Sequence, residues 1–157
     1  MRPDPQPRFR LRRFANCLLL VGSCLLLSCS VPNLEQPDCT QARDVVREFY
    51  SFHFGNDMGF SAENLEKRKG YLTSGYLADL HDAPPTIDPF TRTDDRPKAF
   101  RVGECRVIEQ GRRAAFRVLL FWKTDTRTDQ QAIKVETENV DGKWLIDTVS
   151  DAADLND

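Results

Sequence analysis

Histidine and carboxylate side chains are the residues of this chain that could carry out acid–base chemistry. His53 could act as a general base, and Asp57 or Asp88 could act as an acid or base if buried. The surrounding pattern also allows structural roles. His53 falls among aromatic residues at helical spacing, and Asp88 precedes a proline, where aspartate commonly orders a turn. We therefore favour packing for His53 and a turn for Asp88, and we keep a small enzyme as the third hypothesis for the chain.

Metal and cofactor chemistry finds little support in the sequence. Asp79, His81 and Asp82 offer three ligands, but adjacent residues on a helix cannot all face one point, so we expect a solvated helix end. Asp125 and Asp129 flank a polar loop that lacks the glycine and the final glutamate of an EF-hand. The sequence also contains no C-x-x-C, no glycine-rich phosphate loop and no G-x-S-x-G. We expect neither a metal nor a cofactor.

Another reactive residue, Cys29, closes an apolar run near the start of the chain. Residues 2–13 hold five arginines and one aspartate, and residues 14–28 are apolar or small apart from one asparagine. A basic start, a short apolar run and a small residue before the cut are the three parts of a secretory signal. The run of about 15 residues is shorter than the ~20 that a membrane-spanning helix needs. We therefore expect a cleaved signal peptide.

Residues 26–29, Leu-Leu-Ser-Cys, resemble the lipobox of bacterial lipoproteins. In that family the cysteine thiol is alkylated with diacylglycerol, and cleavage leaves this cysteine as the first residue. Residues 21–24, Val-Gly-Ser-Cys, fit the pattern more loosely, and a plain secreted protein with an incidental Cys29 is the alternative. The resemblance implies a membrane anchor of several acyl chains, palmitate among them. Ser30, rather than aspartate, after the cysteine favours the outer membrane, with the protein facing the periplasm.

These signals divide the chain into four parts. We expect a signal peptide over 1–28, a lipidated cysteine and tether over 29–39, one α+β domain over 40–150 and a polar tail over 151–157. Removing five Arg and one Asp from totals of 22 basic and 24 acidic residues leaves 17 and 23. The resulting net charge of about −6 argues against nucleic acid as a partner and against electrostatic attraction to an anionic membrane.

Two cysteines remain for the domain when Cys29 is assigned to the lipid. Cys39 and Cys105 would stand in an oxidising compartment, where disulfides persist. A bridge between them would close a loop of about 67 residues and stabilise the fold by about 4 kcal/mol on the chain-entropy model. The alternative is two unpaired thiols, one of them buried in a strand.

The order of the expected elements predicts the fold class. Apolar residues at three- and four-residue steps indicate a first helix from a cap at Asp38 to Gly55, then a more polar helix after Ser61 and a short third one after Thr73. Alternating residues then indicate four strands, with a bulge at Gly103. We expect an α+β domain of two to three helices packed on a curved antiparallel sheet of about four strands. The expected strands are 98–109, 113–123, 131–139 and 143–149.

Three short stretches resemble the nuclear transport factor 2-like (NTF2-like), or cystatin-like cone, superfamily. They are residues 45–50 (Val-Val-Arg-Glu-Phe-Tyr), 71–73 (Tyr-Leu-Thr) and 142–147 (Gly-Lys-Trp-Leu-Ile-Asp). Within it, the chain is similar to small bacterial exported proteins of unassigned function that carry an Asp-Pro-Phe before the sheet, here residues 88–90. The resemblance covers roughly Thr40 to Val149. It implies a cone whose wide end opens between helices and sheet.

Such a cone can hold a small ligand, host catalysis or be filled with side chains. The residues that could line a pocket, or belong to the core instead, are Tyr50, His53, Phe54, Tyr76, Asp88, Phe90 and Trp122. We expect a non-catalytic binding domain of unknown ligand. The alternative is a protein-binding inhibitor or immunity-type lipoprotein, because the acidic stretches at 94–95 and 125–129 would suit a basic envelope protein.

Overall fold

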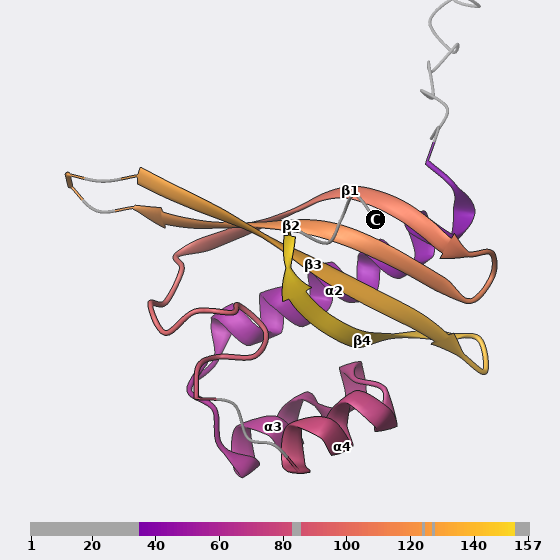
Figure 1. The fold of residues 1–157 in the computed structure, drawn as a ribbon, viewed down its shortest axis with the longest axis horizontal. Coiled ribbons are helices and arrows are strands. Elements are labelled where there is room, and N and C mark those ends of the chain that lie inside the picture. The colour runs from indigo at the N-terminus through magenta and orange to yellow at the C-terminus, as the bar shows by residue number, and fades with distance from the viewer. Residues whose placement is uncertain (1–34, 83–85, 124, 127, 153–157) are drawn as a thin grey trace, which may run out of the picture. The chain divides into compact units, whose positions relative to one another are not determined.

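The computed structural model describes residues 35–82, 86–123, 125–126 and 128–152, so that Cys29 and the expected signal peptide lie outside it. Helices come first in the chain and strands follow, as expected (Figure 1). The four strands form one antiparallel sheet in the order β1-β2-β3-β4, and the predicted α+β class is confirmed. The elements are α2 (Pro37–Gly55), α3 (Ala62–Arg68), the 3-10 turn η1 (Lys69–Tyr71), α4 (Ser74–Asp82), β1 (Ala99–Glu109), β2 (Arg113–Lys123), β3 (Thr128–Val140) and β4 (Lys143–Asp151).

Helix α2 begins earlier than the sequence indicated. Its first residue is Pro37, inside the segment expected to be a tether, because the fixed φ and missing N–H of proline suit the first helical position. Asp38, expected as the cap, is already inside the helix, and the N-cap residue is Gln36. The Asp38 carboxylate instead accepts a hydrogen bond from the backbone N–H of Gly111 at 2.7 Å. It therefore ties the start of α2 to the β1–β2 turn.

One face of α2 packs against the inner face of the sheet. The buried residues on this face recur at one-, three- and four-residue steps: Cys39, Ala42, Val46, Phe49, Tyr50 and His53. They belong to one core cluster with the inward side chains of β2 and β3, among them Phe116, Val118, Leu120, Ile133 and Val135. Burial of each large apolar side chain contributes roughly 1.5–3 kcal/mol. This contact is therefore a principal source of the domain's stability.

The bulge expected at Gly103 is present, and it has a partner on α2. The β1–β2 register shifts between Val102 and Cys105. The helical pattern places Arg43 off the apolar face, yet its guanidinium is half-buried and donates to the carbonyls of Val102 at 3.2 Å and Gly103 at 2.7 Å. A Cβ at Gly103 would lie 3.0 Å from the backbone oxygen of Arg117, so glycine is required there. The bulge thus turns carbonyls toward the helix, which satisfies them.

Strands β3 and β4 are longer than expected. β3 begins at Thr128 rather than at 131, because its first, polar residues pair with the end of β2 (Thr128 opposite Lys123). β4 ends at Asp151, which the sequence assigned to the polar tail. The hairpin turn at Asp141 and Gly142 is confirmed, with φ of 52° and 85° in the left-handed region.

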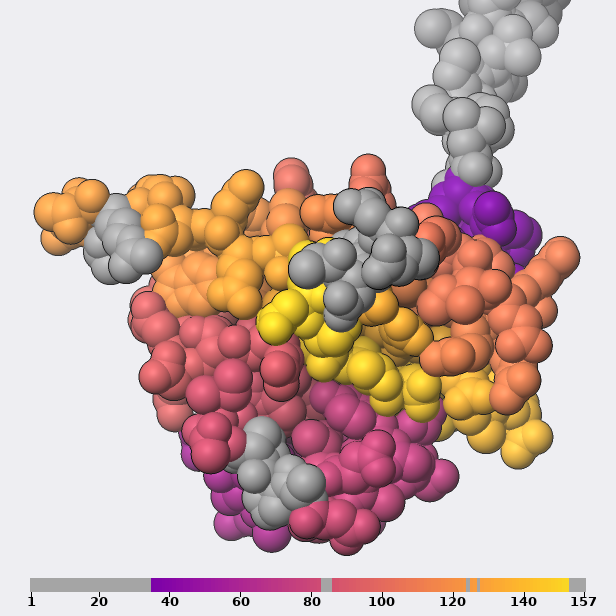
Figure 2. Space-filling model, in the orientation of Figure 1, coloured from indigo at the N-terminus to yellow at the C-terminus, as the bar shows by residue number. Residues whose placement is uncertain are grey.

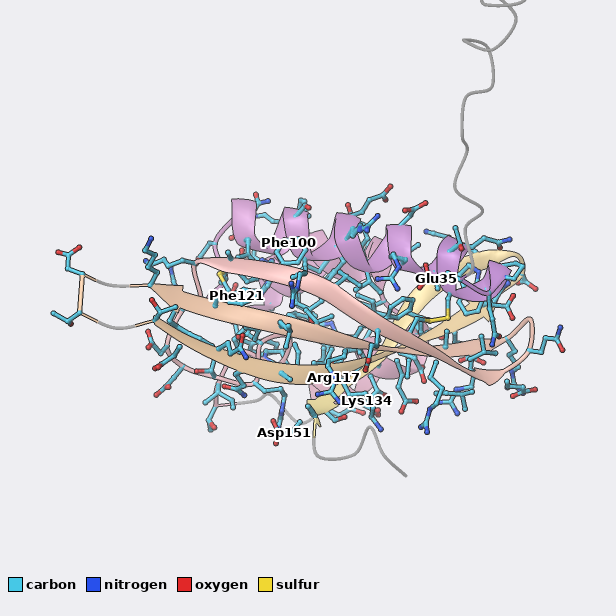
Figure 3. The ribbon with its side chains drawn as sticks, turned by 90° about the horizontal axis from the view of Figure 1, so that it is seen from above. Glu35, Phe100, Arg117, Phe121, Lys134 and Asp151 are labelled. Atoms are coloured by element: carbon cyan, nitrogen blue, oxygen red, sulfur yellow. A yellow bond between two sulfur atoms is a disulfide. The ribbon has the colours of Figure 1, made fainter. Side chains whose placement is uncertain are left out.

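The outer face of the sheet is polar and carries ion pairs. Figure 3 shows Phe100 on the side of the sheet that faces α2, whereas Arg117 and Lys134 point away from the helix. Glu136 joins β2 and β3 there, pairing with Arg113 at 2.7 Å and with Lys134 at 3.1 Å. The sequence indicated that β2 is central and covered on both sides. β2 is central, but among the described residues no helix covers its outer face.

Helices α3 and α4 pack beside α2 and are tied to the last strand. Ser61 caps α3, as predicted, by accepting from the backbone N–H of Asn64 at 3.1 Å. Thr73 accepts from the backbone N–H of Tyr76 at 3.2 Å and donates to Asp147 of β4 at 2.9 Å. No helix among the described residues is both long and apolar enough to cross a membrane.

The expected Cys39–Cys105 disulfide is present. The two Cα atoms lie 5.8 Å apart across 66 positions of sequence, one on α2 and one on β1 beside the bulge. Glu35 lies close enough to both sulfur atoms to form a ligand group for a metal, but the bridge consumes both thiols and Arg43 pairs with the carboxylate. The cysteines therefore serve as a covalent link between the first helix and the sheet.

The disulfide gives the first testable expectation. Replacing Cys39 and Cys105 together by alanine should lower the free energy of unfolding by about 4 kcal/mol, because the unfolded chain regains the freedom of a long loop. Urea unfolding of the parent and the double variant measures this loss. Thiol counting on the denatured, unreduced chain from residue 30 onward should find no free thiol. Two reactive thiols would show that the bridge does not form.

Candidate functional site

Aromatic rings fill the space between α2, the sheet and the loop before β1. The Phe49 ring lies 5.2 Å from Tyr50 and 4.9 Å from Phe90, and it stacks on His53 at 5.7 Å. Phe49 and Tyr50 are 0% exposed, and the Tyr50 hydroxyl donates to the backbone carbonyl of Phe90 at 2.7 Å. Three residues that the sequence offered as pocket walls, Tyr50, His53 and Phe90, are therefore packed against one another as core.

His53 is the centre of a buried polar chain. Its Nδ1 accepts from the guanidinium Nε–H of Arg68 at 2.9 Å, so its proton sits on Nε2, which lies 2.8 Å from the Asp88 carboxylate. The His53 side chain is 1% exposed. The second oxygen of Asp88 accepts the backbone N–H of Phe90 at 2.9 Å, which is the turn contact that the sequence indicated. The imidazole thus separates a buried cation from a carboxylate.

Arg68, which no sequence pattern marked as a site residue, anchors this chain on α3. It is 2% exposed and also donates to the backbone carbonyls of Asn64 at 2.7 Å and Asp57 at 2.8 Å. Burial lowers the pKa of the guanidinium, while the carboxylates of Asp88 and Asp57 act in the opposite direction. The spacing did hold a signal, because Asn64 and Arg68 stand four residues apart and so share a helix face with Leu65.

This arrangement supports positioning rather than proton transfer. A general base needs a ring nitrogen that can reach a substrate, and both nitrogens of His53 are engaged below the surface. Asp57 is on the surface, where the Gly59 N–H and Asn64 lower its carboxyl pKa, and Arg96 pairs with it at 3.3 Å. The polar chain therefore locks α2, α3 and the loop around Asp88 together.

The remaining candidates lie nearer the surface. Phe54 and Tyr76 are half-buried, with Phe54 5.3 Å from Phe100 and Tyr76 6.2 Å from Phe90. Burial raises the pKa of both the Tyr50 and the Tyr76 hydroxyls, and the neighbouring charge of Asp88 acts in the same direction. These phenols stay protonated while the domain is folded.

Two open grooves flank this packed interior. One, of about 280 Å³, lies over Asp88 and includes Thr91 and Arg96 in its lining. The other, of about 350 Å³, lies against Trp122. The seven candidate residues therefore do not converge on one pocket: Asp88 and Trp122 border separate grooves, and the other five contribute to the packed interior.

Comparison with solved structures identifies the fold. A protein of unknown function from Bacteroides thetaiotaomicron VPI-5482 aligns with a TM-score of 0.53 and 18% identity over 87% of this chain and 98% of that chain. A chain of the type VI effector–immunity complex Tae3–Tai3 from Ralstonia pickettii aligns with a TM-score of 0.51 and 16% identity over 70% of this chain and 94% of that chain. At these identities the likeness shows the fold alone. No protein-family model and no curated protein matches the chain.

A third structure is described as an NTF2-like potential transfer protein, TraM, from the Gram-positive conjugative plasmid pIP501. It aligns with 17% identity and a TM-score of 0.46, over 71% of this chain and 94% of that chain, and we base no argument on a score this low. The helices packed on one face of a curved four-stranded antiparallel sheet are the arrangement that the sequence resemblance implied. The domain has the NTF2-like cone fold.

The buried polar chain predicts an unequal response to two neighbouring substitutions. Arg68→Met removes the donor to His53 and to two carbonyls, and should lower the free energy of unfolding by roughly 3 kcal/mol, because buried acceptors lose their partners. Lys67→Met, on the exposed side of the same helix, should stay within about 0.5 kcal/mol of the parent. Urea unfolding of both variants decides the matter. Equal small losses would mean that the chain around His53 does not hold the fold.

The buried tyrosines predict a loss of stability at alkaline pH. The folded-state pKa values of Tyr50 and Tyr76 lie above the unfolded value of about 10, so their contribution is fully present below pH ~10 and is lost as the pH rises beyond it. Unfolding by urea at pH 8 and pH 11 measures this dependence. The double variant Tyr50→Phe and Tyr76→Phe should flatten it. An unchanged slope would show that these hydroxyls ionise without unfolding.

Proposed function

We propose that this chain is a lipid-anchored protein of the bacterial envelope whose domain binds another protein non-covalently. The observation that carries the proposal is the packed interior. Because Phe49, Tyr50 and Phe90 occupy the space where a cone would hold a ligand, recognition falls to the outer surface. Cys29 would carry the acyl chains, and the residues between it and Pro37 would hold the domain away from the outer membrane.

An immunity-type or inhibitory role is the form of protein binding that we favour. The fold is shared with a chain of an effector–immunity complex, so a domain of this architecture is compatible with such a role. A lipid anchor facing the periplasm would place the protein where an imported toxic enzyme acts. The interaction would be stoichiometric and would need no chemistry from this chain.

A small ligand is the second candidate, and one observation favours it. The groove over Asp88 contains the hydroxyl of Thr91, which is buried and has no hydrogen-bond partner among the described residues. Arg96 and Thr93 stand on the same groove, so a small polar molecule could satisfy this hydroxyl. Binding there would be independent of a protein partner.

The anchor can be tested by two matched cysteine substitutions. Cys29→Ala should release the protein from the membrane fraction and abolish incorporation of radiolabelled palmitate, because no thiol remains at the modification position. Cys24→Ala, five residues earlier in the same apolar run, should leave both unchanged. Palmitate entering the Cys29→Ala chain, or lost from the Cys24→Ala chain, would contradict lipidation at Cys29.

The protein-binding role can be tested by competition between cells. A strain lacking this gene should be outgrown by its parent on a solid surface, where cells touch, and not in shaken liquid culture. The gene restored in trans should remove the disadvantage, because the protein would again neutralise the toxin of its neighbours. Equal growth in both conditions would argue against immunity. Protein cross-linking in whole cells, followed by reconstitution of a one-to-one complex from purified components, then tests protein binding of any other kind.

A further inference from the structure

The far end of the β2–β3 hairpin extends beyond the neighbouring strands, and β3 has an open edge there (Figure 1). β3 pairs with β2 from Thr128 onward, but its register with β4 begins only at Ile133, opposite Asp151. Residues 128–132 thus lack a strand neighbour on the β4 side within the described part of the chain. Such an edge presents a row of backbone N–H and C=O groups over roughly 16 Å, and these groups can pair with an added strand.

The groove of about 350 Å³ includes part of this open edge. Its described lining consists of Thr93, Asp95, Trp122, Asp129, Gln130 and Gln131. Trp122 lies opposite Asp129 in the strand register, and its indole N–H donates to the backbone carbonyl of Asp95 at 2.9 Å. The backbone N–H of Asp95 in turn donates to the hydroxyl of Thr93 at 3.1 Å. The ring is therefore fixed in place beside the edge before any partner arrives.

Charge gives the groove a preference. Its two charged residues among those described are Asp95 and Asp129, and both are acidic. They come from two acidic stretches that lie in separate loops along the sequence, and the fold brings one residue of each to the same groove. A cation with a long aliphatic stem fits this combination, since the stem can lie along an aromatic ring while the carboxylates hold the charge.

We propose that an extended segment of a partner protein adds as a strand to residues 128–132 of β3 and places a lysine or arginine side chain in the groove beside Trp122. The inference rests on the proposed function and specifies the surface and the partner's chemistry. Backbone hydrogen bonds along the edge supply affinity, and the groove selects the side chain. In Figure 2 the end of the hairpin stands clear of the body, which leaves room for a strand to approach.

The open edge has two competing roles that require no partner protein. Charged residues such as Asp129 also protect open edges from aggregation, but protection alone requires neither a groove nor a fixed ring. The chain itself offers another occupant. β4 ends opposite Ile133, where the open edge begins, so residues 153–157 follow in sequence at the point where a continued strand would cover it.

A peptide titration followed by amide NMR tests the proposal on the chain from residue 30 onward, which contains the whole compact unit 35–157. The probe is a seven-residue peptide that alternates threonine and valine around a central lysine. It should shift the amide signals of residues 128–132 and the Trp122 indole, and slow hydrogen exchange at the edge. A peptide with central glutamate, and one with N-methylated backbone, should each bind at least tenfold more weakly, because one loses the charge match and the other the backbone donors.

Paired charge variants provide the control. Asp95→Asn with Asp129→Asn should weaken binding of the lysine peptide at least tenfold. Asp94→Asn with Asp125→Asn removes the same charge from neighbouring residues outside the described groove lining, and should change it less than threefold. Equal weakening by both pairs, or equal binding of the lysine and glutamate peptides, would overturn the proposal. Binding that shifts only amides outside 128–132 would also overturn it.

The chain's own end is tested by truncation after Ala152. If residues 153–157 occupy the edge, its amides will be protected before peptide is added, and truncation will remove that protection and raise peptide affinity. This result would overturn the proposal. The proposed function fails separately: a natural partner whose binding survives Asp95→Asn with Asp129→Asn would contradict this inference and leave protein binding intact, whereas the absence of any partner would contradict the function itself.

Discussion

The packing of α2 into the hollow of the sheet is the contact on which the rest of this structure depends. Its buried face supplies the aromatic rings that meet the inward side chains of β2 and β3, and both ends of the helix are fixed. At the first end, the Cys39–Cys105 bridge and the Arg43 contacts to the bulge tie the helix to β1. At the other end, His53 connects it to Asp88 and to α3. A helix held this way cannot be moved aside to admit a ligand without breaking buried polar contacts, which is costly.

A filled interior changes what the fold can be used for. NTF2-like cones can enclose a ligand or a reaction, but here the histidine and the aspartate that would be needed for chemistry are consumed in holding the loop before β1. Recognition then falls to surfaces, and the chain has two distinctive ones: an outer sheet face crossed by ion pairs, and an open strand edge beside a fixed tryptophan. The lipid anchor proposed at Cys29 would fit this division, since it would hold the domain in place while leaving these surfaces free.

Local sequence signals predicted the elements well and the site poorly, for a physical reason. Apolar periodicity, the bulge at Gly103, the Ser61 cap and the Asp141–Gly142 turn are encoded within a few residues, and each was confirmed. Asp38 and Arg43 were misjudged because each is bound by a group about sixty or more residues away, Gly111 and Gly103 respectively. Arg68 escaped notice because a buried arginine and a surface arginine look alike in sequence. The pocket residues were drawn from the right region, but whether rings line a cavity or fill it depends on distances that no pattern contains.

The measurement that tests the central claim most directly is native mass spectrometry of the chain from residue 30 onward, exported to the periplasm and purified without denaturation. Its mass is compared with that of the same sample after denaturation. A packed interior predicts the bare mass of the oxidised chain in both states, because the space between α2 and the sheet holds no room for a bound molecule. An additional small mass that disappears on denaturation, and that persists when the surface groove over Asp88 is blocked by Thr91→Trp, would contradict this account and show that the cone carries a ligand.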